Sequence, residues 1–371
     1  MTATSQPQRT RVYLHHHLQS SRWDGYSPRE GDIIVTTSLK AGTTWMQRIV
    51  SLLVFGAGPL PAPLGDISPW VDSRFNQTSP EETLARLDRQ EHRRFMKSHL
   101  PFDSLPYFPE VSYVFVCRDT RDVFMSLLNH YGAYTPFIYQ AFGVLAPESE
   151  PFPPFPGDPH VLWEWFMTRS YFPWEEDGYP FWSHHYHAAS YWPYRSLPNV
   201  LFVHYADLKA DLEGEMRRLA AFLEIDVRNE DWPELVDLAT FDRMKEQGDE
   251  LMPGMGVAFD GGSQRFLHKG TNGRWHDVLS ADELQLYDTA AAKLDPALRR
   301  WMENGRLVAG DPRESWSVTA STTPVSRLRC TATRIAVMCA PSSKVTRVRP
   351  CPSMPRTNAV NRSAFQFSVD G

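Results

Sequence analysis

The order of apolar and polar positions predicts alternating strands and helices between residues 32 and 310. Buried parallel strands are predicted for three short runs of apolar and β-branched residues, DIIVTT (32–37), YVFVC (113–117) and VLFVHY (200–205). Helical spacing of apolar residues is found at 43–55, 122–131 and 209–225. This alternation favours a doubly wound α/β fold with a mostly parallel sheet flanked by helices, whose ligands bind at the carboxyl ends of the strands.

Three segments depart from this alternation. Residues 1–31 are polar, and we expect an N-terminal extension that packs on the surface. Residues 132–198 are rich in proline and aromatic residues, which favours a lid or acceptor-pocket wall inside a single domain spanning 32–310. Residues 311–371 are basic and rich in Ser, Thr and Pro without a helical period, so a disordered tail is expected.

Composition and charge narrow the class of protein. The chain has 371 residues and a net charge of −6, so nucleic acid is not an expected partner. Its four cysteines include no CxxC pair, and it has neither a signal peptide nor a long apolar run, so a cytoplasmic protein without a membrane span is expected. Two histidine runs, at 15–17 and 184–187, lack matched carboxylates or cysteines, so we interpret them as surface or pocket residues rather than metal ligands.

The segment SLKAGTTW (38–45) joins the first predicted strand to the first predicted helix. Gly42 permits close approach of the backbone, Thr43 and Thr44 offer hydroxyl groups, and Lys40 adds a positive charge at a helix N-terminus, so the turn resembles a P-loop-like phosphate cradle. It is not a Walker A loop, because Lys40 precedes Gly42 instead of following it. Two alternatives remain: an ordinary strand–helix turn, and a P-loop-type small-molecule kinase.

Two other positions have the chemistry of an anion site. Arg118 follows a buried strand, so its guanidinium emerges at the edge where ligands bind, and Ser126 lies two helical turns further on. A surface salt bridge between Arg118 and Asp119 or Asp122 is the alternative interpretation. His99 follows a predicted short strand at 94–97 and precedes a proline, which places its imidazole at the same edge of the sheet.

Four blocks of this sequence resemble, in order, motifs of the cytosolic-type sulfotransferase family: TTSLKAGTTW (36–45), MKSHLP (96–101), VFVCRDTRDVFMSLLNHY (114–131) and FLHKGTNGRWHDVLSADEL (266–284). They frame residues 30–305, most of the chain. The resemblance implies that the sulfuryl donor is 3′-phosphoadenosine 5′-phosphosulfate (PAPS), that the product is adenosine 3′,5′-bisphosphate (PAP), and that no metal is required. The acceptor it implies is a small molecule with a hydroxyl or amine group, and the apolar segment 132–198 favours an alcohol, phenol, sterol or lipid alcohol.

The resemblance also implies roles for individual residues. His99 corresponds to the general base, and Lys40, Lys97 and Ser126 to residues that assist the transfer. The implied nucleotide-binding residues are Lys40, Ala41, Gly42, Thr43, Thr44, Trp45, Arg118, Ser126, Tyr205, Thr240, Phe241, Met244, His268, Lys269 and Gly270.

Three departures from the family pattern affect what is implied. Ala239 and Thr240 replace a threonine and a serine, which removes one side-chain hydrogen bond, and His268 replaces an arginine expected at the 3′-phosphate. The family's dimer motif would fall at 276–285, where its four characteristic residues are replaced by His276, Ser280, Ala281 and Gln285, so the oligomeric state stays open. A non-catalytic nucleotide-binding scaffold also remains as an alternative.

Overall fold

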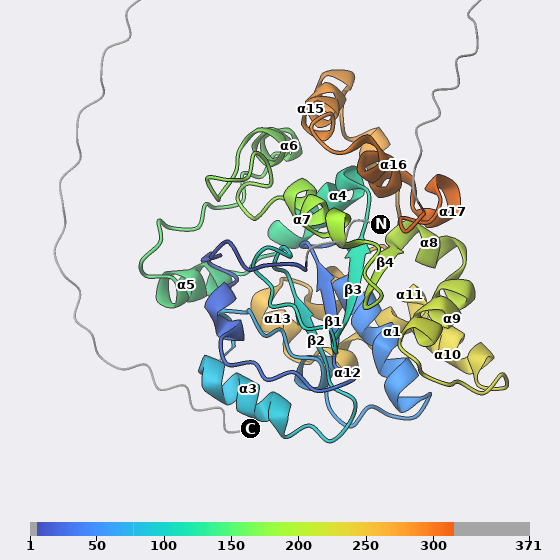
Figure 1. The fold of residues 1–371 in the computed structure, drawn as a ribbon. Coiled ribbons are helices and arrows are strands. Elements are labelled where there is room, and N and C mark those ends of the chain that lie inside the picture. The colour runs from blue at the N-terminus through green and yellow to red at the C-terminus, as the bar shows by residue number, and fades with distance from the viewer. Residues whose placement is uncertain (1–5, 77, 315–371) are drawn as a thin grey trace, which may run out of the picture. The chain divides into compact units, whose positions relative to one another are not determined.

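A four-stranded parallel sheet forms the centre of the structure, a computed structural model that describes residues 6–76 and 78–314. The strands lie in the order β2-β1-β3-β4 and span Phe95–Ser98, Ile33–Thr37, Ser112–Cys117 and Val200–His204 respectively (Figure 1). Almost every strand residue is buried, because helices cover both faces, and this explains the nearly continuous apolar runs. The predicted α/β fold with a parallel sheet is confirmed.

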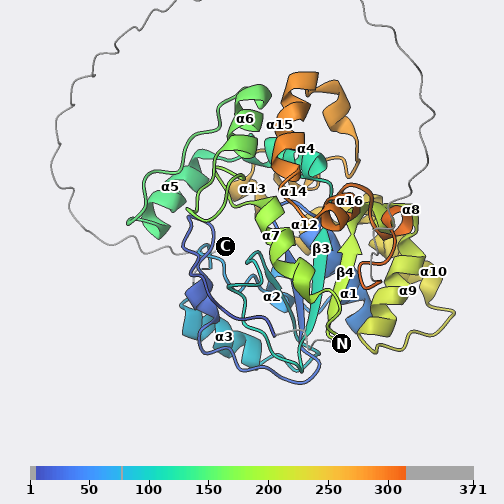
Figure 2. The same cartoon turned by 45° about the horizontal axis from the view of Figure 1, so that its top comes forward.

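Side chains from the two faces of the sheet belong to two separate hydrophobic cores. One core joins Val35, Val114 and Val203 to helices α1 (Thr43–Phe55), α9 (Leu212–Phe222) and α10 (Trp232–Ala239). The other joins Ile34, Phe115 and Phe202 to α4 (Thr120–Tyr131), α7 (His184–Tyr191) and α16 (Pro296–Asn304). Figure 2 shows α7 and α1 separated by the strands, as a doubly wound sheet requires.

The predicted helix at 209–225 is two helices in the structure. Helix α8 (Tyr205–Ala210) begins directly after β4, so Tyr205 is the first residue of a helix and not the last of a strand. The chain then breaks at Asp211, which has φ −147° and accepts a hydrogen bond from the Gly214 N–H at 2.9 Å. An aspartate in this geometry is an N-cap, so the break marks the start of α9.

The N-terminal segment corrects the prediction of a surface extension. Tyr13, Leu18 and Trp23 are at most 2% exposed and belong to the core. The Trp23 Nε1–H donates to Asp72 at 3.0 Å, and the Tyr13 hydroxyl accepts from Trp174 Nε1 at 2.9 Å. The segment looks polar in sequence because its apolar residues are isolated, but distant side chains pair with buried polar atoms of Tyr13 and Trp23.

The aromatic segment 132–198 forms a packed wall of the domain. It contains α5 (Pro136–Leu145), α6 (Pro159–Thr168), α7 and the 3₁₀ helix η2 (Trp192–Tyr194). Trp163, Trp182 and Tyr191 are at most 2% exposed. Side chains buried to this extent are core residues, so the wall interpretation fits this segment better than a mobile lid.

The remaining elements complete one compact unit. They are η1 (Ser20–Trp23), α2 (Leu64–Ile67), α3 (Pro80–Asp88), α11 (Phe241–Glu246), α12 (Gly248–Leu251), α13 (Met255–Ala258), α14 (Gly262–Phe266), η3 (Arg274–Asp277), α15 (Ala281–Ala291) and α17 (Arg306–Ala309). Within residues 6–76 and 78–314, no helix combines the length and hydropathy needed to cross a bilayer. The tail predicted at 311–371 falls, beyond residue 314, outside the described residues.

Candidate functional site

The turn between β1 and α1 has the geometry of an anion cradle. Gly42 has φ +115°, and a Cβ there would lie 3.0 Å from the Tyr205 ring, so glycine is required for both reasons. Gly42 is also the N-cap of α1 and no side chain caps this helix, which leaves N–H groups of its first turn available to a ligand. Thr43 is held by a 2.5 Å hydrogen bond between its Oγ1 and that of Thr37, while Ala41 is buried and Thr44 is partly exposed.

Lys40 lies in the cradle as a partly buried cation without an acidic partner among its described contacts. Its Nζ is 3.5 Å from His130 Nδ1 and 4.1 Å from the centroid of the Phe266 ring. Burial, and then the charges of Lys97 and Arg118, lower the pKa of Lys40 to about 7. A bound anion would therefore stabilise the protonated form of Lys40.

His130, which sequence analysis missed, is the residue of α4 that lies beside Lys40. Ser126 lies one turn earlier on α4 and is partly exposed, and the described contacts of Lys40 are with His130 and Phe266. The four-residue spacing of Ser126 and His130 puts them on one helix face, which is the only sequence signal for this contact.

Lys97 reaches the same region from β2. Its Nζ lies 4.8 Å from the centroid of the Trp70 ring, a cation–π contact that sequence analysis did not anticipate. Burial lowers the pKa of Lys97 to about 8, and the negative charge of Asp72 limits the decrease. Lys40 and Lys97, which both lose a proton more easily than a free lysine, therefore lie at the same site.

His99 is oriented by the same strand end that holds the cradle. Its Nδ1 lies 2.9 Å from the carbonyl oxygen of Thr37. A carbonyl can only accept, so the proton is on Nδ1 and the lone pair is on Nε2. The rings of Trp70 and Trp182 lie 4.9 and 5.7 Å from the imidazole. Burial, then the charge of Lys97, lowers the pKa of His99 to about 3, so the free protein holds a neutral imidazole here.

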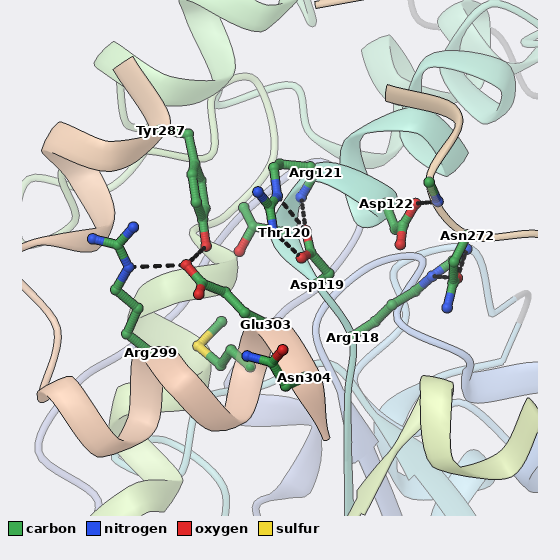
Figure 3. Close-up of polar contacts among 12 residues, drawn as sticks. Arg118, Asp119, Thr120, Arg121, Asp122, Asn272, Tyr287, Arg299, Glu303 and Asn304 are labelled. Atoms are coloured by element: carbon green, nitrogen blue, oxygen red, sulfur yellow. Dashed lines mark hydrogen bonds and ion pairs between the residues drawn. The ribbon is translucent and has the colours of Figure 1, made fainter. Parts of the chain in front are cut away.

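Arg118 emerges from the end of β3 and is held by the loop before η3 (Figure 3). Its Nη2 donates to Asn272 Oδ1 at 2.7 Å and to the Thr271 carbonyl at 2.9 Å, and its guanidinium lies 4.0 Å from the centroid of the Tyr205 ring. The alternative of a salt bridge with Asp119 is wrong, because that carboxylate pairs with Arg121.

Asp122, the other partner considered for Arg118, accepts a hydrogen bond from the Gly273 N–H at 2.7 Å (Figure 3). Both acidic neighbours of Arg118 therefore make their hydrogen bonds to other groups: Asp119 binds Arg121 on α4, and Asp122 binds the backbone of the loop.

The residues predicted at the nucleotide base form two contacting groups. Trp45 lies edge-to-face with Tyr205 at 5.0 Å and donates through Nε1 to the Ala239 carbonyl at 2.7 Å. Phe241 packs on Gly270, where a Cβ would lie 2.7 Å from the phenyl ring. Trp45 lies on α1, and Gly270 directly precedes the loop that holds Arg118.

Three other predicted residues differ in their surroundings. The Thr240 hydroxyl donates to the Asp237 carbonyl at 2.7 Å and caps α11, so it serves the helix. Met244 is buried in the core, and Lys269 is exposed.

His268 does not replace the charge of the arginine that the family pattern places there. Its pKa is lowered to about 4 by partial burial and then by the charges of Arg274, Arg265, Lys269 and Lys245. The imidazole is therefore neutral at physiological pH and carries no positive charge.

The histidines at 15–17 are buried among aromatic rings, so the interpretation as surface residues is wrong. His17 Nε2 lies 2.8 Å from the Tyr134 hydroxyl, and His15 Nε2 lies 2.9 Å from the Pro180 carbonyl. Among the described residues, no three His, Cys, Asp or Glu side chains are arranged to hold a metal ion.

Comparison with known proteins identifies the family. The sulfotransferase domain model matches residues 30–303. A glycolipid sulfotransferase of Mycobacterium bovis (strain BCG / Pasteur 1173P2) is 34% identical over 316 residues, which cover 80% of this chain and 94% of that protein. Cytosolic sulfotransferase 12 of Arabidopsis thaliana is 30% identical over 273 residues, covering 69% and 74% of the two chains.

Solved structures show the same fold. A mouse sulfotransferase, SULT7A1, complexed with PAP, has a TM-score of 0.56 at 19% identity and covers 76% of this chain and 91% of that one. Retinol dehydratase in complex with androsterone and PAP has a TM-score of 0.56 at 20% identity, with coverage of 74% and 83%. The domain match over most of the chain and the long alignments at 30% identity or more establish that this chain belongs to the sulfotransferase family.

Proposed function

We propose that this protein transfers the sulfuryl group of PAPS to a hydroxyl group of a small, apolar, lipid-like acceptor, with His99 as general base. One observation carries the proposal: Thr37 contacts both parts of the machinery. Its hydroxyl is 2.5 Å from Thr43 in the cradle, and its carbonyl is 2.9 Å from His99 Nδ1. The anion cradle and the imidazole are therefore adjacent and held by one strand end.

The chemistry follows from this arrangement. The acceptor oxygen attacks sulfur while the bond from sulfur to the 5′-phosphate oxygen breaks, and Nε2 of His99 takes the hydroxyl proton. Negative charge grows on the leaving oxygen, so Lys40 and the N–H groups at the start of α1 stabilise the transition state. Bound PAPS brings negative charge close to His99, which raises the pKa of the imidazole and strengthens it as a base.

The rest of the nucleotide would follow the loop that holds Arg118. The guanidinium of Arg118 is suited to the 3′-phosphate, and Trp45 and Phe241 offer faces to the adenine ring. His99, by contrast, is in contact with the rings of Trp70 and Trp182. Two aromatic rings next to the base favour an acceptor with an apolar body, and the mycobacterial relative is named as a glycolipid sulfotransferase.

A donor-dependent acceptor screen tests the proposal. Purified protein is incubated with ³⁵S-labelled PAPS and glycolipids, sterols, phenols or simple polar alcohols, and sulfated product and PAP are quantified together. We expect equimolar product and PAP with at least one apolar hydroxyl compound, and none with His99→Ala. Transfer from ATP with Mg²⁺ but not from PAPS would overturn the proposal in favour of a kinase.

A further inference from the structure

A second arginine, Arg274, lies beside the loop that holds Arg118. Gly273, with φ +80°, donates its N–H to Asp122 at 2.7 Å, and Asn272 binds the guanidinium of Arg118 (Figure 3). These two contacts hold the adjacent residues Asn272 and Gly273 in place immediately before η3. Arg274 is the first residue of η3, so its position is set by the residues that position Arg118.

The guanidinium of Arg274 lacks a partner that would account for its burial. Its Nε is fully buried and has no hydrogen-bond partner in the structure. Buried polar atoms are normally paired, and an unpaired donor on a charged group is costly. A bound ligand that accepts a hydrogen bond would supply the partner that this Nε–H lacks.

The charges around Arg274 point to an anionic ligand. Partial burial and then the positive charge of Arg118 lower the pKa of Arg274, while Asp122 and Tyr205 oppose the decrease. Arg274 also has the largest effect of any charged group on the neutral His268. Two guanidinium groups thus repel each other beside Asp122, whose Oδ1 is already hydrogen-bonded to Gly273.

We propose that Arg274 is a nucleotide-binding residue whose guanidinium acts with that of Arg118 to bind the 3′-phosphate of PAPS and PAP. The inference rests on the assignment of the 3′-phosphate to Arg118 in the proposed function. A phosphate dianion can accept hydrogen bonds from two guanidinium groups at once. Its charge offsets their mutual repulsion, and one of its oxygens pairs with the buried Nε of Arg274. Arg274 thereby supplies the positive charge that neutral His268 does not.

Isothermal titration calorimetry with PAP and with 5′-AMP, which lacks the 3′-phosphate, tests this role. We expect Arg274→Gln to weaken PAP binding about 10- to 100-fold, the range for a lost hydrogen bond to a charged group, and to leave 5′-AMP affinity within about twofold. Arg228→Gln is the matched control, because Arg228 forms a surface ion pair with Asp231 and its side chain is 73% exposed. Thermal unfolding of each variant verifies that it is folded.

A compensating variant separates a shared phosphate from a local structural effect. His268→Arg in the Arg274→Gln background should restore much of the PAP affinity and change 5′-AMP affinity little, because the charge of Arg274 acts on His268 and an arginine there returns a cation close to the one removed. Equal losses for both nucleotides, or unchanged PAP affinity in Arg274→Gln, would overturn the role of Arg274. A wild-type protein with no preference for PAP over 5′-AMP would instead overturn the nucleotide assignment itself, and the inference with it.

Discussion

Nucleotide binding should take up protons between pH 7 and pH 8. In the free protein the pKa of Lys40 is about 7 and that of Lys97 about 8, both lowered mainly by burial. A bound polyanion stabilises both ammonium groups and returns their pKa values toward 10.5, so each lysine gains the protons that it lacked. The secondary phosphate ionisation lies below this range and contributes little.

The structure gives the size of this effect. From these two pKa values, the free protein lacks about 0.6 proton at pH 7 and about 1.4 protons at pH 8, and these are the expected uptakes on binding. Since the protonated form binds the anion, affinity must fall as pH rises, by about tenfold between pH 7 and pH 8 when the same two values are used.

Titration calorimetry with PAP in buffers of different ionisation enthalpy measures the uptake directly. Lys40→Met should leave only the contribution of Lys97, about 0.1 proton at pH 7 and about 0.5 at pH 8. Lys293→Met, which removes an exposed lysine paired with Glu176, should match the wild type. Uptake near zero at both pH values, or unchanged uptake in Lys40→Met, would refute the assignment of these lysines to the anion site.

Three further changes test other parts of the structure. His99→Ala should lower kcat by about 10²- to 10⁴-fold and change PAP affinity less than twofold; near-normal turnover would rule out the base assignment. Gly270→Ala forces a Cβ to within 2.7 Å of the Phe241 ring at φ +62°, so PAP affinity by calorimetry should fall at least about tenfold; unchanged affinity would separate this contact from the nucleotide site. Asp32→Asn leaves the charge of Arg94, whose side chain is 1% exposed, without its buried partner. Urea unfolding should show a loss of about 3 kcal/mol, against less than about 0.5 kcal/mol for Glu82→Gln in an exposed pair; equal losses would contradict the burial argument.

The parts of the site that sequence could predict are those set by local geometry. A strand, a tight turn at Gly42 and a helix N-terminus make an anion cradle from one continuous segment, so SLKAGTTW is sufficient to predict it. The end of a buried strand likewise fixes where Arg118 emerges. Both expectations depend on a few neighbouring residues and on the geometry of parallel sheets.

Contacts between distant segments were not predictable in this way. The proximity of Lys40 to His130, and that of Arg118 to Asn272, depend on how α4 and the loop before η3 pack on the sheet. The burial of the N-terminal segment could not be predicted for the same reason. Tyr13 and Trp23 are single apolar residues among polar ones, and only their long-range partners show that they are buried.

The use of acidic residues explains how a chain of net charge −6 keeps a positive site. Asp72 accepts hydrogen bonds from Trp23, Trp70 and the His99 N–H, and so holds these three groups in position. Asp122 in the same way accepts from Gly273. The cations that face the nucleotide site thus keep their mutual repulsion in the free protein, at a cost in stability. A bound anion removes that repulsion without rearranging the scaffold, so affinity for the nucleotide and resistance to unfolding must rise together.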